Sequence, residues 1–288
     1  MACIEEAPEG YYIHVGNHKK IFAQVAGEGK QAIVLVHGWG LNHNMWKDYV
    51  PTLKDDYKVV AIDLRGFGKS SKPLTGYSYK TWADDISKVI ECLELEHVTL
   101  AGYSLGGAIA MYYVSKGVKP AVERLALIAA AGPCMTKLRG RLEDESRKFL
   151  ETQIKILEQD MRRGKKVDRR EQVFQQFYQV PHINDKDWKW LTDMLWSASL
   201  QALLWAIKEM AKWDLTDALE QIAIGNQTRI CHGLKDSLVP FTKAQEQHRR
   251  IKGSTLIPFE NGHLLFYCEQ EKLCNNLSGS QANLRRNF

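Results

Sequence analysis

Short apolar segments rich in β-branched residues recur along the first 130 positions, and longer amphipathic segments lie between the later ones. The segment from Trp82 to Leu93 carries apolar residues three and four positions apart, which places them on one face of a helix. Strands that alternate with helices need crossover connections, so the pattern predicts an α/β fold with a mostly parallel sheet. The predicted strands are 32–36, 59–63, 98–102 and 125–130, and a hairpin of 11–15 and 21–25 precedes them.

The pattern changes between residues 133 and 212, where no convincing strand appears. Tryptophan, methionine, glutamine, lysine and arginine dominate this stretch, which therefore predicts an inserted helical cap. Strand-like segments resume at 228–231 and 254–259, and a helix is predicted at 264–277. We therefore expect a core formed by residues 1–132 and 213–277, a cap at 133–212 and a flexible polar tail at 278–288.

Composition and length are those of an ordinary soluble globular protein. The chain has 288 residues, of which 44% are hydrophobic and 25% charged. No apolar run reaches the ~18 residues of a membrane-spanning helix, and the acidic N-terminus does not resemble a secretory signal. We expect no membrane span and a cytoplasmic location.

The net charge of +5 is concentrated in one segment. Residues 137–170 hold twelve Lys and Arg against seven Asp and Glu, an excess equal to the net charge of the whole chain. The segment lacks the interleaved aromatic residues of a single-strand binder, so we expect a solvated helical surface and no nucleic-acid partner. An acidic carrier protein remains open as a partner of this segment.

The cysteine spacing indicates neither a metal site nor a disulfide framework. No Cys-x-x-Cys pair and no cluster of histidines occurs, so we expect reduced thiols and no bound metal. The six cysteines are Cys3, Cys92, Cys134, Cys231, Cys268 and Cys274.

The strongest chemical signal is Gly-Tyr-Ser-Leu-Gly-Gly at residues 102–107. It follows a predicted strand directly and precedes a helical segment, so Ser104 is predicted to lie on a sharp turn between the two. Small neighbours permit such a tight turn, and the following helix directs its positive end toward the serine hydroxyl. Ser104 is the candidate nucleophile.

A serine hydroxyl needs a base to accept its proton and a third group to orient that base. Asp236 follows the predicted strand 228–231, and His263 follows the last predicted strand in Asn-Gly-His. We expect His263 to be the base and Asp236 the orienting acid. The other candidates do not follow strand ends in the required order; they are His37, His232 and His248 for the base and Asp214 and Asp217 for the acid.

A third element is Val-His-Gly-Trp-Gly at residues 36–40, directly after a predicted strand. Backbone amides on such a loop can stabilise the oxyanion of a tetrahedral intermediate without reorganisation. We expect the amides of Trp39 and Leu105 to form this oxyanion hole, and we expect His37 to brace the loop.

Over residues 11–277 the chain resembles the α/β-hydrolase superfamily, whose nucleophile, acid and base follow the order Ser104, Asp236, His263. The segment Asp-Leu-Arg-Gly-Phe-Gly-Lys-Ser at 63–70 matches a loop of that family. The chain is most similar to the serine esterases grouped with cofactor-free haloperoxidases, because it shares Gly-Tyr-Ser-Tyr at 76–79 and Trp-x-x-Asp at 82–85. The resemblance implies a mostly parallel α/β-hydrolase sheet flanked by helices, with an inserted helical cap.

The resemblance also implies an activity. We expect cleavage of a small-molecule ester or lactone with a small to medium apolar acyl group, through an acyl-enzyme and without metal or organic cofactor. Gly40 stands where peracid-forming relatives carry proline, which argues against peracid formation. Residues expected to contact the substrate are Trp39, Tyr103, Val239 and Leu264.

Several functions stay open at this point. Relatives that open epoxides or carbon–halogen bonds use an aspartate nucleophile, so Ser104 argues against those reactions. A thioesterase, a carbon–carbon bond hydrolase and a non-catalytic ligand sensor all keep the serine. The sequence does not fix the oligomeric state, and a homodimer is compatible with it.

Overall fold

The computed structural model describes residues 3–138, 141–142, 144–163, 169–178 and 183–278. Within these residues nine strands form one sheet in the order β1-β2-β3-β5-β4-β6-β7-β10-β11. The first three pair antiparallel, as do β3 and β5, and the remaining pairs are parallel. The strands are β1 (Ile4–Ala7), β2 (Gly10–His14), β3 (Lys20–Ala26), β4 (Ala32–Val36), β5 (Lys58–Ile62), β6 (Thr99–Tyr103), β7 (Arg124–Ile128), β10 (Thr228–Gly233) and β11 (Thr255–Phe259).

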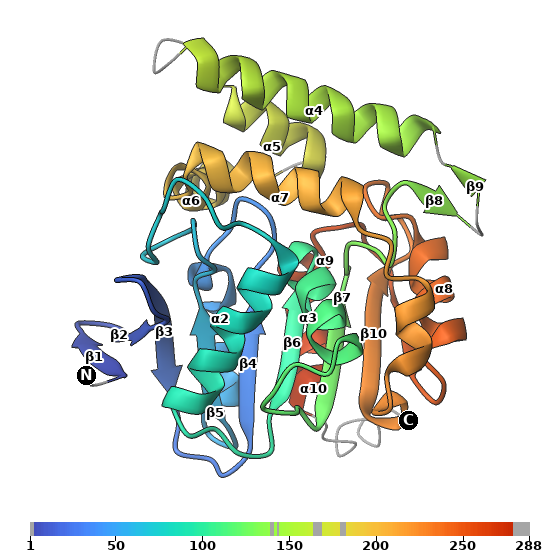
Figure 1. The fold of residues 1–288 in the computed structure, drawn as a ribbon. Helices are drawn as coiled ribbons and strands as arrows, with labels where there is room; N and C mark the ends of the chain where they lie inside the picture. Colours follow the sequence, from blue (N-terminus) through green and yellow to red (C-terminus); the bar gives the residue numbers. More distant parts are fainter. Residues whose placement is uncertain (1–2, 139–140, 143, 164–168, 179–182, 279–288) are drawn as a thin grey trace.

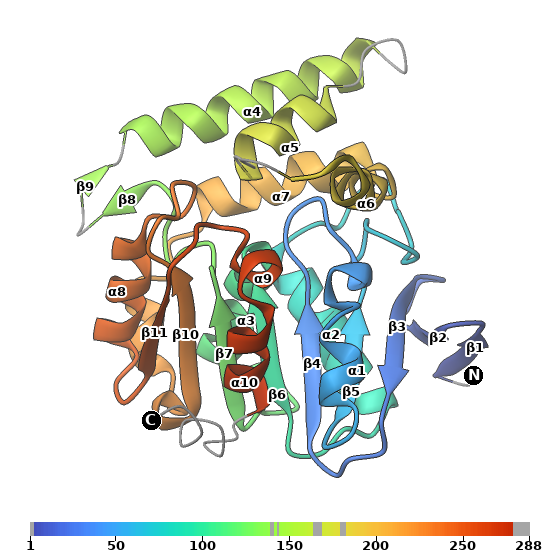
Figure 2. The ribbon, with the colours of Figure 1, turned by 180° about the vertical axis from the view of Figure 1, so that it is seen from behind.

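Helices cover both faces of the sheet. Helices α2 (Tyr79–Cys92) and α3 (Leu105–Ser115) lie on the face toward the viewer in Figure 1, and α1 (Val50–Leu53) and α10 (Gln270–Ser278) lie on the face shown in Figure 2. This double cover explains why β4 reads as an uninterrupted apolar run, Ala-Ile-Val-Leu-Val, with every residue buried. The predicted α/β class with a mostly parallel sheet is confirmed.

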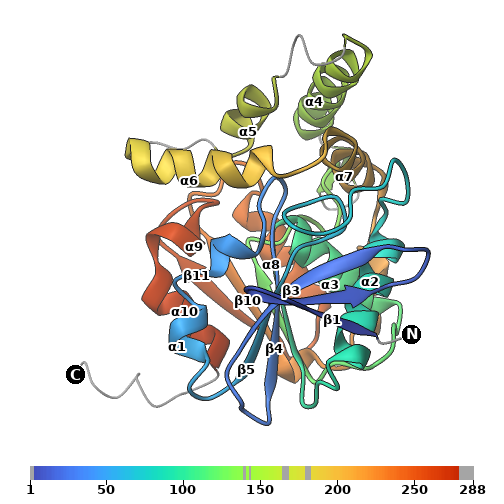
Figure 3. The ribbon, with the colours of Figure 1, turned by 90° about the vertical axis from the view of Figure 1, so that its left-hand side faces the viewer.

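Four further helices lie across the carboxyl ends of the parallel strands (Figures 1 and 3). We call α4 (Asp144–Arg163), α5 (Arg170–Tyr178), α6 (Asp185–Trp196) and α7 (Leu200–Lys212) the cover helices. They occupy most of the segment predicted to be a helical cap, and the division of the chain into core and cap domains stays a prediction. The expectation of no strand in this segment is wrong, because β8 (Lys137–Leu138) and β9 (Arg141–Leu142) form a short antiparallel pair.

The C-terminal part of the fold differs in detail from the predicted single helix at 264–277. Two helices, α9 (Leu265–Cys268) and α10, meet at Glu269, whose backbone leaves the helical region. The Glu269 carboxylate accepts hydrogen bonds from the backbone and side-chain amides of Asn261, which tie this break to the loop after β11. Helix α8 (Phe241–Arg250) lies between β10 and β11 in the chain and was not predicted. Of the predicted tail, residues 279–288 lie outside the described residues.

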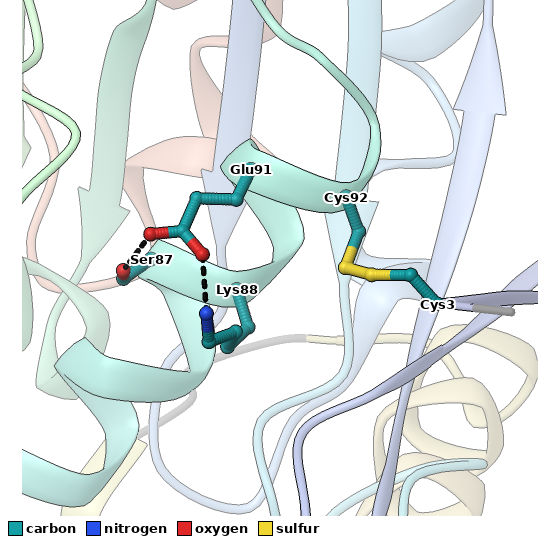
Figure 4. Close-up of a disulfide and its surroundings, with 5 residues drawn as sticks. All are labelled: Cys3, Ser87, Lys88, Glu91 and Cys92. Carbon is teal, nitrogen blue, oxygen red and sulfur yellow. Dashed lines mark hydrogen bonds and ion pairs between the residues drawn. A yellow bond between two sulfur atoms is a disulfide. The ribbon is translucent and has the colours of Figure 1, made fainter. Parts of the chain in front are cut away.

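One disulfide joins Cys3 to Cys92, so the expectation that all six cysteines are reduced is wrong for this pair (Figure 4). Their separation of 89 residues gave no indication of pairing; the fold brings the chain before β1 beside the last residue of α2. Cys134, Cys231, Cys268 and Cys274 are free. Because two of the six cysteines are paired, they no longer support a cytoplasmic location, which stays a prediction. Among the described helices, none is both long and apolar enough to cross a membrane.

Candidate active site

Ser104 lies at the junction of β6 and α3 with φ of 52° and ψ of −112°, a region that non-glycine residues rarely occupy. Its backbone is fixed by the hydrogen bond from its N–H to the Ile128 carbonyl (2.9 Å). A Cβ atom at Gly102 would approach the Gly106 carbonyl oxygen to 2.3 Å, and one at Gly106 would approach the Val36 carbonyl oxygen to 2.4 Å. Both positions must therefore be glycine for the turn to close.

The structure brings the three predicted catalytic residues together. His263 Nε2 lies 3.0 Å from Ser104 Oγ, and His263 Nδ1 lies 2.7 Å from Asp236 Oδ2. The geometry fits a neutral imidazole whose Nδ1–H donates to the carboxylate and whose Nε2 accepts from the serine hydroxyl. All three residues are buried, with relative exposures of 3% for Ser104 and 5% each for Asp236 and His263. This arrangement can transfer a proton from serine to histidine.

The Asp236 carboxylate is held on both oxygens. Its Oδ1 accepts hydrogen bonds from the backbone amides of Leu238 (3.0 Å) and Val239 (2.8 Å), so Oδ2 is left to face His263. Burial alone would raise the pKa of this carboxyl. The attraction of His263, its hydrogen bond and the nearby His232 ring outweigh burial and hold the pKa well below its usual range. Asp236 therefore stays ionised beside the histidine.

The alternative candidates have other partners. His232 lies next to the carboxylate, with Nε2 3.3 Å from Asp236 Oδ2, but its Nε2–H donates to the Val239 carbonyl (2.7 Å). His248 contacts Ser254 Oγ at 3.0 Å. Asp214 pairs with Cys134 in an isolated β-bridge, and Asp217 lies 3.5 Å from Arg250 on the surface.

The predicted oxyanion donors lie beside the nucleophile. Leu105 is the first residue of α3, where helical N–H groups lack intrahelical acceptors. In the described part of the chain, no backbone carbonyl accepts a hydrogen bond from the amide of Trp39 or Leu105. A Cβ at Gly38 would lie 3.3 Å from Ser104 Cβ, so the loop that carries Trp39 runs directly past the serine. Their role as oxyanion donors stays a prediction.

His37 braces this loop, as predicted. It is fully buried; its Nδ1–H donates to the Gly38 carbonyl (2.8 Å), and its Nε2 accepts from the Leu64 amide (3.0 Å). Burial lowers the pKa of His37 to about 4, so the ring is neutral and can make both bonds at neutral pH. Because a trans peptide points its C=O and N–H in opposite directions, fixing the Gly38 carbonyl also fixes the Trp39 N–H.

The four residues expected to contact substrate lie near the triad, and three of them make hydrogen bonds of their own. Tyr103 donates from its hydroxyl to the His263 carbonyl (2.9 Å), and Val239 bonds to Asp236 as described. Leu264 follows His263 directly and is 7% exposed. Trp39 is 1% exposed, and its indole N–H donates to the Leu203 carbonyl in α7 (2.8 Å). Their contact with substrate stays a prediction.

Sequence reasoning missed the contacts that the cover helices make with the oxyanion loop. The Tyr178 hydroxyl, from the last residue of α5, donates to the Trp39 carbonyl (2.6 Å). Its ring centre lies 5.7 Å from that of His263. The aromatic content of α5 gave a general packing signal but no indication that this tyrosine reaches the nucleophile loop 139 positions away.

Comparison with known proteins agrees with this geometry. The family described as alpha/beta hydrolase fold matches residues 31–269. The AB hydrolase superfamily protein YisY of Bacillus subtilis is 35% identical over 266 residues, which cover 92% of this chain and 96% of that protein. A putative non-heme chloroperoxidase of Synechocystis is 28% identical over 85% of this chain and 90% of that protein. The solved structure of the esterase EaEST from Exiguobacterium antarcticum has a TM-score of 0.84 and 33% identity over 93% of this chain and 97% of its own.

Proposed function

Since this chain belongs to the alpha/beta hydrolase family and is similar to its haloperoxidase-like members, we propose that it is a serine hydrolase that cleaves carboxylic esters or lactones through an acyl-enzyme. The observation that carries the proposal is the hydrogen-bonded chain from Ser104 through His263 to Asp236. The similarity to a solved esterase at 33% identity supports the ester class.

In the first half-reaction, Ser104 Oγ attacks the carbonyl carbon of the substrate while its proton passes to His263 Nε2. The carbonyl oxygen becomes an oxyanion, which accepts hydrogen bonds from the Trp39 and Leu105 amides. When the tetrahedral intermediate collapses, the bond to the alkoxy oxygen breaks and His263 gives its proton to that oxygen. The alcohol leaves, and the acyl group remains on Ser104.

The second half-reaction repeats these steps with water. His263 takes a proton from a water molecule as that water attacks the acyl carbon. The ester bond to Ser104 then breaks, the proton returns to Oγ, and the carboxylic acid is released. Asp236 stays ionised throughout and stabilises the imidazolium formed in each half-reaction.

The residues around the triad favour an apolar acyl group of small to medium size. Aromatic side chains from α5 and the oxyanion loop converge here: Trp39 stacks on Phe177 with ring centres 4.7 Å apart, and Phe174 contacts Tyr178 at 4.4 Å. We expect Trp39, Tyr103, Val239 and Leu264 to shape the substrate site.

A series of p-nitrophenyl esters of increasing acyl length, with matched lactones and thioesters, tests this proposal. We expect turnover of short esters or lactones that is lost in Ser104→Ala. A chain that binds these compounds without hydrolysing any of them would support the ligand-sensor alternative, and a strong preference for thioesters would support the thioesterase alternative.

A further inference from the structure

Trp39 belongs to the loop of residues 36–40 after β4, yet the cover helices make three contacts with it. Its carbonyl accepts from the Tyr178 hydroxyl of α5, its indole N–H donates to the Leu203 carbonyl of α7, and its ring stacks on Phe177 with an interplanar angle of 16°. Trp39, Tyr178 and Leu203 are all at most 3% exposed. Buried hydrogen bonds of this kind are costly to leave unmade, so they restrict the loop strongly.

The two peptide planes that flank the Trp39 Cα are each fixed by a different part of the molecule. His37 holds the Gly38 carbonyl and so sets the plane that contains the Trp39 N–H, and Tyr178 holds the plane of the next peptide through the Trp39 carbonyl. The first contact comes from His37, which directly follows β4, and the second comes from α5. The direction of the amide at the oxyanion site therefore depends on both.

The Tyr178 hydroxyl is suited to a permanent donor role. Burial raises the pKa of Tyr178 well above its usual value, so the hydroxyl keeps its proton at neutral pH. The ring packs against Phe174 and His263, whose ring centres lie 4.4 Å and 5.7 Å from its own. A rigid donor costs little entropy when it holds its acceptor.

We propose that Tyr178 is a positioning residue for the oxyanion hole, so that α5 takes part in transition-state stabilisation as well as covering the site. This inference rests on the proposed function, because it assigns the Trp39 amide to the oxyanion. The catalytic site would then be complete only with α5 in place over the sheet. Helix α5 would contribute to the reaction rate as well as to the shape of the substrate site.

The variant Tyr178→Phe tests the proposal, because it removes one hydroxyl and keeps the ring. We expect kcat to fall about tenfold while KM changes by less than twofold, since an oxyanion donor acts in the transition state and losing one outright costs about 10²–10³. Tyr113→Phe is the matched control: Tyr113 also has a low exposure, 1%, and donates to a backbone carbonyl, that of Pro120 at 2.6 Å, but it lies toward the far end of α3. We expect its kcat to equal that of the wild type.

Inhibitor binding separates positioning from a general effect on stability. A trifluoromethyl ketone forms a serine adduct with an oxyanion, whereas the product carboxylate does not. In Tyr178→Phe we expect affinity for the ketone to fall about as much as kcat/KM, with affinity for the product unchanged. A lower melting temperature with unchanged kcat and unchanged ketone affinity would overturn the proposal.

A second variant keeps the test open if Tyr178→Phe does not fold. Tyr178→Met removes the same hydroxyl and puts a flexible apolar side chain next to Phe174, so we expect a similar selective loss of ketone affinity. Equal ketone affinity in this variant and the wild type would contradict the proposal. The proposed function fails separately, if wild type and Ser104→Ala hydrolyse esters equally.

Discussion

His263 Nε2 lies 3.0 Å from Ser104 Oγ, although 159 positions separate the two residues in the chain. Ser104 follows β6 and His263 follows β11, and both strands end at the same edge of the sheet because they run parallel within it. The topology therefore delivers the nucleophile and its base to one place, and Asp236, after β10, completes the chain of hydrogen bonds.

Replacing Ser104 by Ala should abolish covalent catalysis while leaving the fold intact, because only one buried hydroxyl is removed. We expect a loss of roughly 10⁴–10⁶ in kcat, as is typical of serine nucleophiles. Ser115→Ala, at the other end of the same helix, is the matched control and should retain full activity. Activity of Ser104→Ala within tenfold of wild type would refute its role as nucleophile.

Asp236→Asn should lower kcat by about 10⁴, because an amide facing Nδ1 favours the wrong imidazole tautomer. The change is nearly isosteric, so we expect the fold to survive. Circular dichroism and the melting temperature check this. Asp214→Asn serves as the comparison, since Asp214 is one of the two other candidate acids. A greater loss in Asp214→Asn than in Asp236→Asn would show that the acid is wrongly assigned.

The burial of His37 predicts a pH dependence of stability. Its pKa is about 4 in the folded protein and about 6.5 when exposed, so between these values the unfolded chain binds more protons than the folded one. The contribution of the neutral His37 ring to the free energy of unfolding is fully present above pH 6.5 and is lost as the pH falls toward 4. Between pH 7 and pH 5 we expect a loss of about 2 kcal/mol.

Urea unfolding of the wild type and of His37→Gln at a series of pH values measures this effect. The variant lacks the titrating ring, so its free energy of unfolding should change less steeply over the same interval. Parallel pH dependences of the two proteins would show that His37 is not held neutral by the fold.

Much of this arrangement could be predicted because it depends on local signals. The strand–serine–helix pattern around Ser104, the glycines beside it and the strand ends before Asp236 and His263 all act over a few residues. The disulfide between Cys3 and Cys92 and the bond from Tyr178 to Trp39 could not be predicted, since each joins segments whose proximity depends on the whole fold. Helix α8 was missed because its polar residues weaken the apolar periodicity.

The disulfide predicts a redox effect on stability. Because it closes a loop of about 90 residues between β1 and α2, reduction should lower the free energy of unfolding by about 2–4 kcal/mol. Alkylation under denaturing conditions followed by intact-mass measurement should find four modified cysteines before reduction and six after it. The free energy of unfolding of Cys3→Ser should not change with reductant. Six modified cysteines in the untreated protein would show that Cys3 and Cys92 are not bonded.

The covalent intermediate is the most direct test of the proposed function. Rapid acid quenching of the protein during turnover of a p-nitrophenyl ester, followed by peptide mass spectrometry, locates any bound acyl group. We expect one acyl group on Ser104, which is absent from Ser104→Ala and accumulates when deacylation is slowed. Steady turnover with no acylated peptide, or with the acyl group on another residue, would contradict it.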